Sequence, residues 1–96
     1  MDTDISISKL KLLGDKINLI DIRDEKLFNQ GRILKAKNIP IYKLLSDSSF
    51  YLKEDECYYL YCEKGCSSTY VCKMLAKEGY QVVNIIGGYR AWQQEQ

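Results

Sequence analysis

The sequence contains no histidine, and this absence restricts the chemistry that the chain can perform. Histidine is the usual general base near neutral pH. It also completes the Ser-His and Cys-His pairs of many enzymes and every mixed Cys/His zinc site. A nucleophile in this chain must therefore be activated in another way.

Long apolar runs and an excess of one charge are also missing. No apolar stretch approaches the roughly 20 residues that span a bilayer, and the opening residues, MDTDISIS, lack the basic and apolar regions of a signal peptide. The formal net charge is only +1, which gives little attraction for a polyanion. We expect a cytoplasmic protein whose partners include neither nucleic acid nor a membrane.

The length and composition indicate one globular domain. The chain has 96 residues, of which 46% are hydrophobic and 28% charged. This length is near the lower limit for a core that is stable without disulfides or metals. We therefore predict a single domain over residues 1–96, with no room for a second catalytic domain.

Four cysteines lie close together in the second half of the chain: Cys57, Cys62, Cys66 and Cys72. In a reducing cytoplasm they are expected to be free thiols. Their number would suffice for a four-thiolate zinc site, but the close paired spacings of such sites are missing. We predict no metal and no cofactor, and we assign Cys57 and Cys72 to packing.

Strand patterns alternate with helix patterns along the chain. The strand patterns lie at residues 18–22, 36–40, 57–62 and 81–86, after a short strand and helix near the N-terminus. A helix of about three turns is predicted after Cys62, with Ser67 or Ser68 as its N-terminal cap. This alternation predicts an α/β fold with a mostly parallel sheet that is covered by helices on both faces.

Cys62 follows the strongest strand pattern and precedes the loop into this helix. In α/β sheets, functional groups gather beyond the carboxyl ends of the strands. A tight loop containing Gly65 can turn several backbone N–H groups inward, and the helix N-terminus adds a favourable dipole. Both features favour the thiolate form of Cys62, so the sulfur needs no histidine to become a nucleophile.

Two blocks of the sequence resemble the single-domain rhodanese-like sulfurtransferases. The first is LIDIRDEKLFNQGRILKAKNIP, and the second is YLYCEKGCSSTYVCKMLAKEGYQVVNIIGGYRAW. The resemblance implies a rhodanese-like fold with a five-stranded, mostly parallel sheet. It also implies that Cys62 is the nucleophile and that the rest of a six-residue substrate-binding loop is formed by Glu63, Lys64, Gly65, Cys66 and Ser67.

The activity implied by this resemblance is the transfer of sulfane sulfur in two steps. Cys62 takes sulfur from a small donor, thiosulfate or a persulfide, and becomes a persulfide itself. An acceptor then removes the outer sulfur. The acceptor is cyanide in an assay or a thiol in the cell, and a protein thiol is a further possible partner.

The loop departs from the family pattern at several positions. Arg32 replaces a histidine that mostly belongs to structure. Glu63 replaces a frequent arginine and is expected to oppose the thiolate, an effect that Lys64 could offset. Ser67 and Ser68 leave the loop without a guanidinium to hold an oxyanion, which argues against a phosphatase or an arsenate reductase.

Two other functions stay open. One is a rhodanese-like module that binds a partner without catalysis. The other is a thiol redox switch, in which Cys66 attacks an oxidised or persulfidated Cys62. For Cys66 we prefer the simpler interpretation of a small residue that fills the loop.

Four further side chains have two interpretations each. Asp21 and Arg23 end an earlier strand, and Arg23 could position a donor, but for both we prefer a helix-capping carboxylate and an ion pair that orient neighbouring loops. Tyr89 and Trp92 either shape the rim of the pocket or pack the last helix against the sheet.

Overall fold

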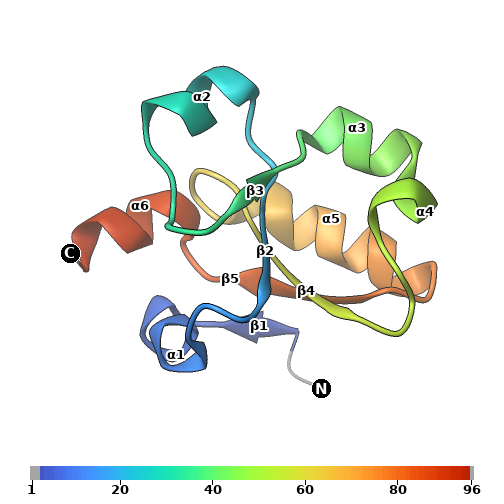
Figure 1. Cartoon of the computed structure of the whole chain (residues 1–96), viewed down its shortest axis with the longest axis horizontal. Coiled ribbons are helices and arrows are strands. Elements are labelled where there is room, and N and C mark those ends of the chain that lie inside the picture. The colour runs from blue at the N-terminus through green and yellow to red at the C-terminus, as the bar shows by residue number, and fades with distance from the viewer. Residues whose placement is uncertain (1–2, 96) are drawn as a thin grey trace.

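The computed structural model describes residues 3–95 and has the predicted α/β architecture (Figure 1). Its elements, in chain order, are β1 (Asp4–Ile5), α1 (Ile7–Leu13), β2 (Asn18–Asp21), α2 (Glu25–Gln30), β3 (Lys37–Asn38), α3 (Ile41–Ser46), α4 (Ser48–Tyr51), β4 (Cys57–Tyr61), α5 (Cys66–Lys77), β5 (Gln81–Ile85) and α6 (Gly88–Gln94). The described strands and helices thus alternate along the chain, except where α3 is followed directly by α4.

The strands form one five-stranded sheet in the order β1-β5-β4-β2-β3, and every pairing is parallel. The central strand β4 pairs with β2 on one side, where Leu19 lies opposite Tyr59, and with β5 on the other. A strand with neighbours on both sides and helices on both faces suits an apolar, aromatic run such as CYYLY. The carboxyl end of β4 therefore places Cys62 at the middle of one edge of the sheet.

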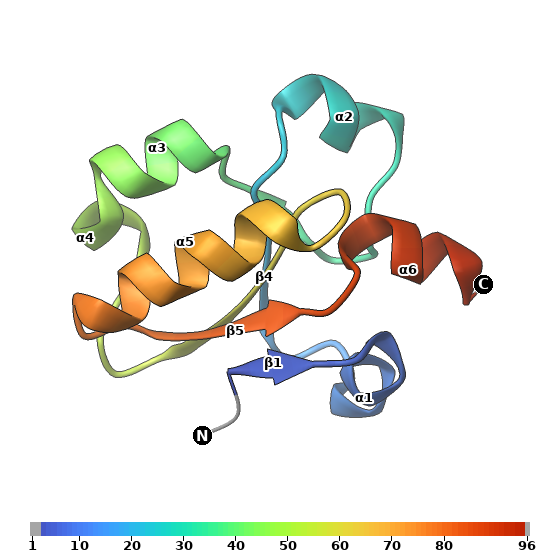
Figure 2. The ribbon, with the colours of Figure 1, turned by 180° about the vertical axis from the view of Figure 1, so that it is seen from behind.

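Helices cover both faces of the sheet, as predicted, with α3, α4 and α5 on one side and α1 and α6 on the other (Figure 2). Successive residues of β4 point to opposite faces: Leu60 belongs to the core under α5, and Tyr61 to the core near α1 and α6. Both side chains are fully buried. Burial of one such side chain stabilises the fold by about 1.5–3 kcal/mol.

The start of α5 differs from the prediction. The helix begins at Cys66, and its N-terminal cap is Gly65 in the left-handed conformation (φ 98°) rather than Ser67 or Ser68. A serine cap would place the serine outside the helix, whereas Ser68 lies in its first turn with its side chain fully buried. The prediction of a serine cap was therefore wrong.

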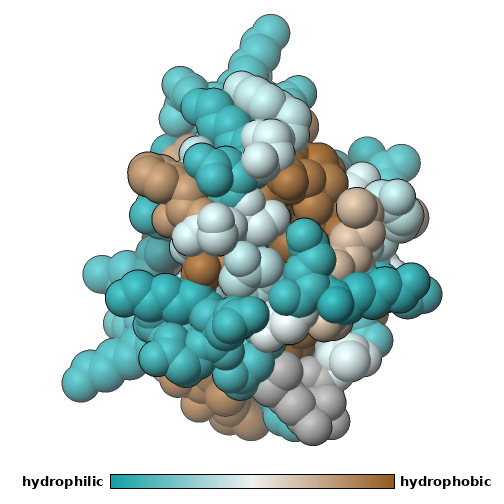
Figure 3. All heavy atoms as spheres, turned by 90° about the vertical axis from the view of Figure 1, so that its right-hand side faces the viewer, coloured by the Kyte–Doolittle hydropathy of each residue, from teal (hydrophilic) through white to brown (hydrophobic). Residues whose placement is uncertain are grey.

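The end of the molecule that carries α3, α4 and the C-terminal part of α5 lies away from the Cys62 loop (Figure 1). On this side, hydrophobic side chains show as separate patches between hydrophilic ones (Figure 3). Within residues 3–95, no helix has the length and apolar character needed to cross a membrane.

Candidate active site

The loop that carries Cys62 connects the end of β4 to the start of α5 and is held from both sides. The backbone N–H groups of Tyr89 and Arg90, in the first turn of α6, donate to the carbonyls of Cys62 (2.9 Å) and Glu63 (3.0 Å). The left-handed conformation of Gly65 then reverses the chain into α5. Because both ends of the loop are bonded to regular elements, its inward-facing groups have a fixed geometry.

The Cys62 sulfur is surrounded by hydrogen-bond donors from its own loop. The backbone N–H groups of Gly65 and Ser68 donate to Sγ at 3.1 and 3.3 Å, and the hydroxyl of Ser68 lies 3.3 Å from it. The sulfur also lies beside the N-terminus of α5, a helix of 12 residues. Backbone donors and a helix N-terminus both stabilise negative charge, and this arrangement around Sγ involves no histidine.

Cys62 is 6% exposed and reaches the surface through a small pocket of about 180 Å³. Apart from Cys62 itself, the pocket is lined by Glu63, Lys64, Cys66 and Ser67. Four of the predicted substrate-binding residues thus share one pocket with the sulfur. The fifth, Gly65, lines an adjoining hollow and contributes its backbone N–H to Sγ.

The carboxylate of Glu63 is paired with two arginines. Its Oε1 is 2.9 Å from Nη1 of Arg23, and its Oε2 is 3.5 Å from Nε of Arg90. The positive charge that offsets Glu63 therefore comes from the segment after β2 and from α6. The sequence suggested Lys64 for this role, because partners so distant in the chain leave no local signal.

Arg23 is 7% exposed and forms the centre of a buried polar cluster. Its guanidinium binds both carboxylate oxygens of Asp21, donates to the Gly31 carbonyl (2.6 Å) and lies 4.3 Å from the centre of the Tyr89 ring. Burial opposes the charge of Arg23, but its hydrogen bonds to Asp21 and Glu63 outweigh this cost and raise its pKa. These contacts agree with an ion pair that orients neighbouring loops. The N-cap residue of α2 is Asp24, so the expectation that Asp21 caps a helix was wrong.

Ser68 and Asn84 are two buried polar residues that the sequence did not identify as part of the site. The Ser68 hydroxyl donates to Oδ1 of Asn84 at 2.5 Å while touching the Cys62 sulfur. Serine at the start of a helix pattern is a common capping signal, so no sequence pattern indicated that this hydroxyl would lie next to the Cys62 sulfur.

The other cysteines differ from Cys62 in their surroundings. All four are free thiols, as predicted. Cys72 is buried, and burial, with smaller contributions from Asp4 and Cys62, raises the pKa of its thiol to about 12. Cys57 is half-buried and Cys66 is exposed. Among residues 3–95, no group of three Cys, Asp or Glu side chains could hold a metal ion.

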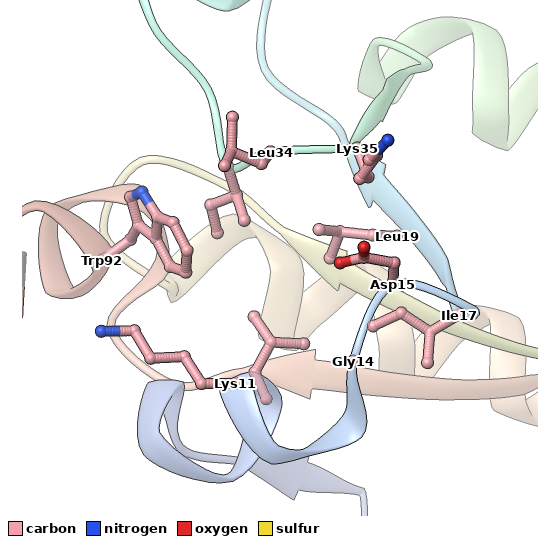
Figure 4. Close-up of a pocket in the computed structure, with 10 residues that line it drawn as sticks. Lys11, Gly14, Asp15, Ile17, Leu19, Leu34, Lys35 and Trp92 are labelled. Atoms are coloured by element: carbon pink, nitrogen blue, oxygen red, sulfur yellow. The ribbon is translucent and has the colours of Figure 1, made fainter.

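A second pocket of about 170 Å³ lies between α1, α6 and the turn at Leu34 and Lys35 (Figure 4). Trp92 lines this pocket, and the Lys11 ammonium lies 5.3 Å from the centre of its ring. Trp92 also packs against the core on this face of the sheet. Trp92 is thus absent from the lining of the Cys62 pocket, whereas Tyr89 stacks on Arg23 behind the loop.

Comparison of the chain with known proteins identifies its family. The chain matches the Rhodanese-like domain model over residues 6–95. It is 35% identical over 78 residues to "Uncharacterized protein YqhL" of Bacillus subtilis (strain 168), and the match covers 80% of this chain and 61% of YqhL. It is 32% identical over 81 residues to "Putative sulfurtransferase YtwF" of the same organism, with 84% of this chain and 78% of YtwF covered.

A solved structure also relates the chain to rhodanese-like domains. The crystal structure of a rhodanese-like domain protein from Staphylococcus aureus superposes with a TM-score of 0.84 at 33% sequence identity, and it covers 96% of this chain and 91% of that chain. The family match extends over nearly the whole sequence, and the relatives agree with it. The chain belongs to the rhodanese-like domain family.

Proposed function

We propose that this protein is a sulfurtransferase that carries sulfane sulfur on Cys62. The observation that carries the proposal is the Cys62 sulfur, which accepts two backbone hydrogen bonds from its loop and lines a pocket that opens to solvent. Membership of the rhodanese-like family and the name of the relative YtwF support the same activity.

In the first step, the Cys62 thiolate attacks the sulfane sulfur of a donor. With thiosulfate, a new S–S bond forms to Cys62, the S–S bond of thiosulfate breaks, and its electron pair leaves with sulfite. Negative charge then lies on the outer sulfur of the Cys62 persulfide. Inward-facing N–H groups of the loop stabilise such charge, because their dipoles are already oriented before the reaction.

In the second step, an acceptor takes the outer sulfur and Cys62 leaves as a thiolate. Cyanide gives thiocyanate, and a thiol, either small or on a protein, gives a new persulfide. The two N–H groups that stabilise the thiolate of the free enzyme also stabilise it as a leaving group. No metal, cofactor or histidine is required for either step.

The charge around the pocket bears on the choice of donor. Glu63 carries a negative charge beside the nucleophile in sequence, but Arg23 and Arg90 are paired with it, and Lys64 lines the same pocket. Because these positive charges offset the carboxylate of Glu63, the pocket is compatible with an anionic donor. Thiosulfate and glutathione persulfide are the two donors to compare.

Steady-state transfer to cyanide tests the proposal. The protein is mixed with thiosulfate or glutathione persulfide and cyanide, and thiocyanate is measured. We expect thiocyanate from the wild-type protein, background levels from Cys62→Ala, and wild-type levels from the matched control Cys57→Ala, which removes a half-buried thiol inside β4. Background levels from the wild-type protein with both donors would favour the non-catalytic binding module.

A further inference from the structure

A buried polar chain connects the Cys62 sulfur to the first strand, and the transfer steps above do not use it. Ser68 is fully buried and Asn84 is 4% exposed. The Ser68 hydroxyl contacts Cys62 Sγ at 3.3 Å and donates to Asn84 Oδ1 at 2.5 Å, and Nδ2 of Asn84 donates to Oδ1 of Asp4 at 3.1 Å. Buried polar groups are costly unless they are bonded, and this chain bonds each of them to the next.

The Ser68 hydroxyl has one proton and several acceptors within reach. Asn84 Oδ1 can only accept, and it faces Ser68 because the amide nitrogen on its other side is bonded to Asp4. With the proton on the Asn84 side, the Ser68 oxygen can accept a hydrogen bond from a neutral Cys62 thiol. A thiolate has no proton to donate and is stabilised only by donors, so it competes with Asn84 for the same proton.

We propose that Ser68 is a further catalytic residue, whose hydroxyl turns from Asn84 to the Cys62 sulfur when that sulfur is negatively charged. In this proposal Asn84 is a positioning residue that competes for the hydroxyl proton and so limits the stability of the thiolate. The rotation exchanges one hydrogen bond for another and transfers no proton.

The catalytic role of this exchange rests on the proposed sulfur transfer. Cys62 Sγ is charged before it attacks a donor, is neutral inside the persulfide, and becomes charged again as the leaving group. In the reaction with cyanide, a C–S bond forms to the outer sulfur, the S–S bond breaks, and its electron pair stays on Cys62. The Ser68 hydroxyl can donate to this sulfur while it is charged and to Asn84 while it is neutral. It thus stabilises the thiolate without donating to the neutral sulfur.

The two residues are expected to shift the thiolate in opposite directions. Ser68→Ala removes a donor to a charged sulfur and should lower the ratio of thiolate to thiol by about tenfold. Asn84→Ala removes the nearer competing acceptor and leaves the Gly65 carbonyl, which lies 3.4 Å from the Ser68 hydroxyl, so it should raise this ratio by a few-fold. In the double variant the effect of Asn84→Ala should vanish, because the proton for which Asn84 competes is gone.

The experiment uses a parent protein that carries Cys57→Ser and Cys66→Ser, so that its remaining thiols are Cys62 and Cys72, and burial raises the pKa of Cys72 to about 12. Ultraviolet thiolate absorbance gives the ionised fraction of Cys62 at the pH where the parent is half deprotonated. This measurement needs no sulfur donor. A second measurement follows how fast cyanide removes sulfur from the loaded proteins, and we expect Ser68→Ala to slow this step by about tenfold.

Thr69→Ala is the matched control. Its hydroxyl lies in the same turn of α5 and donates to the Gly65 carbonyl at 2.7 Å. Ser68 is the residue whose hydroxyl contacts the sulfur, so Thr69→Ala should leave the thiolate fraction unchanged. Circular dichroism and thermal unfolding check that each variant is folded. If Asn84→Ala fails this check, Asn84→Leu removes the acceptor while keeping a similar volume.

Opposite shifts for Ser68→Ala and Asn84→Ala, with no Asn84 effect in the double variant, support the proposal. Shifts in the same direction, or effects that add in the double variant, would overturn it, since both are expected of residues that only maintain the fold. If the wild-type protein accepts no sulfur from any donor, the proposed function fails, and the absorbance measurement alone then decides whether Ser68 stabilises the thiolate.

Discussion

Glu63 and Arg23 are joined by an ion pair of 2.9 Å, which links the residue after Cys62 to the segment that follows β2. Arg23 is almost fully buried, whereas the Glu63 side chain is 37% exposed. Arg23 in turn binds the fully buried carboxylate of Asp21. The pair therefore fixes the loop against the sheet, and it compensates the negative charge of Glu63 next to Cys62.

The two acidic partners of Arg23 should differ in their effect on stability. Asp21→Asn weakens a buried pair and should cost about 3 kcal/mol, because it leaves an arginine charge in the interior with less compensation. Glu63→Gln should cost about 1 kcal/mol, since solvent screens this partly exposed residue and Asp21 remains. Urea unfolding of both variants measures the free energy of unfolding. A larger loss for Glu63→Gln than for Asp21→Asn would contradict this ranking.

Gly65→Ala should disturb the loop more than an equivalent change elsewhere. Gly65 has φ +98°, and a Cβ at this position would lie 2.9 Å from the backbone nitrogen of Gly87. Gly14 also has a positive φ (+76°), but a Cβ there would have nothing within 4 Å. Left-handed strain alone costs about 1–2 kcal/mol, so Gly14→Ala is a matched control for that component.

We expect Gly65→Ala to lose more stability than Gly14→Ala in urea unfolding, and to lose most of its sulfur transfer. Gly14→Ala should retain transfer, because Gly14 follows α1 and takes no part in the Cys62 loop. Equal losses of stability, together with full transfer by Gly65→Ala, would show that the loop tolerates a side chain at this position.

Cys72 should make stability fall at alkaline pH. Its pKa is raised from an ordinary 9.0 to about 12 in the folded protein, mainly by burial. The unfolded chain therefore loses this proton first, so the contribution is complete below pH 9.0 and is lost as the pH rises toward 12. The loss amounts to at most about 4 kcal/mol, from about 1.4 kcal/mol per pKa unit.

Urea unfolding between pH 8 and pH 11 compares the wild-type protein with Cys72→Ala. The variant is less stable overall, but its free energy of unfolding should fall less steeply with pH. Lysines and tyrosines titrate in both proteins, so their contribution cancels in the comparison. Parallel curves would show that the Cys72 thiol ionises as readily in the folded protein as in the unfolded chain.

The sequence predicted the frame of the molecule well, because local patterns determine it. The apolar run of β4 and the period of α5 identified a strand and its following helix, and they placed Cys62 between the two. In a parallel sheet the carboxyl ends of the strands meet at one edge, so the position of the loop followed from the topology.

The details around the sulfur were less predictable, because they depend on contacts between distant parts of the chain. The partners of Glu63 come from the segment after β2 and from α6, and Ser68 bonds to Asn84, which is 16 positions away. Helix capping is normally a local rule, but here Gly65 replaces the expected serine, and its N–H points at the sulfur.

Intact mass, measured after incubation with thiosulfate or glutathione persulfide, shows whether Cys62 carries sulfane sulfur. We expect the wild-type protein to gain the mass of one sulfur atom, cyanide to remove it, and Cys62→Ala to gain nothing. An unchanged mass with both donors would show that Cys62 carries no sulfur. A loss of two hydrogens that depends on Cys66 would also contradict the proposed transfer, since it would point to a redox switch instead.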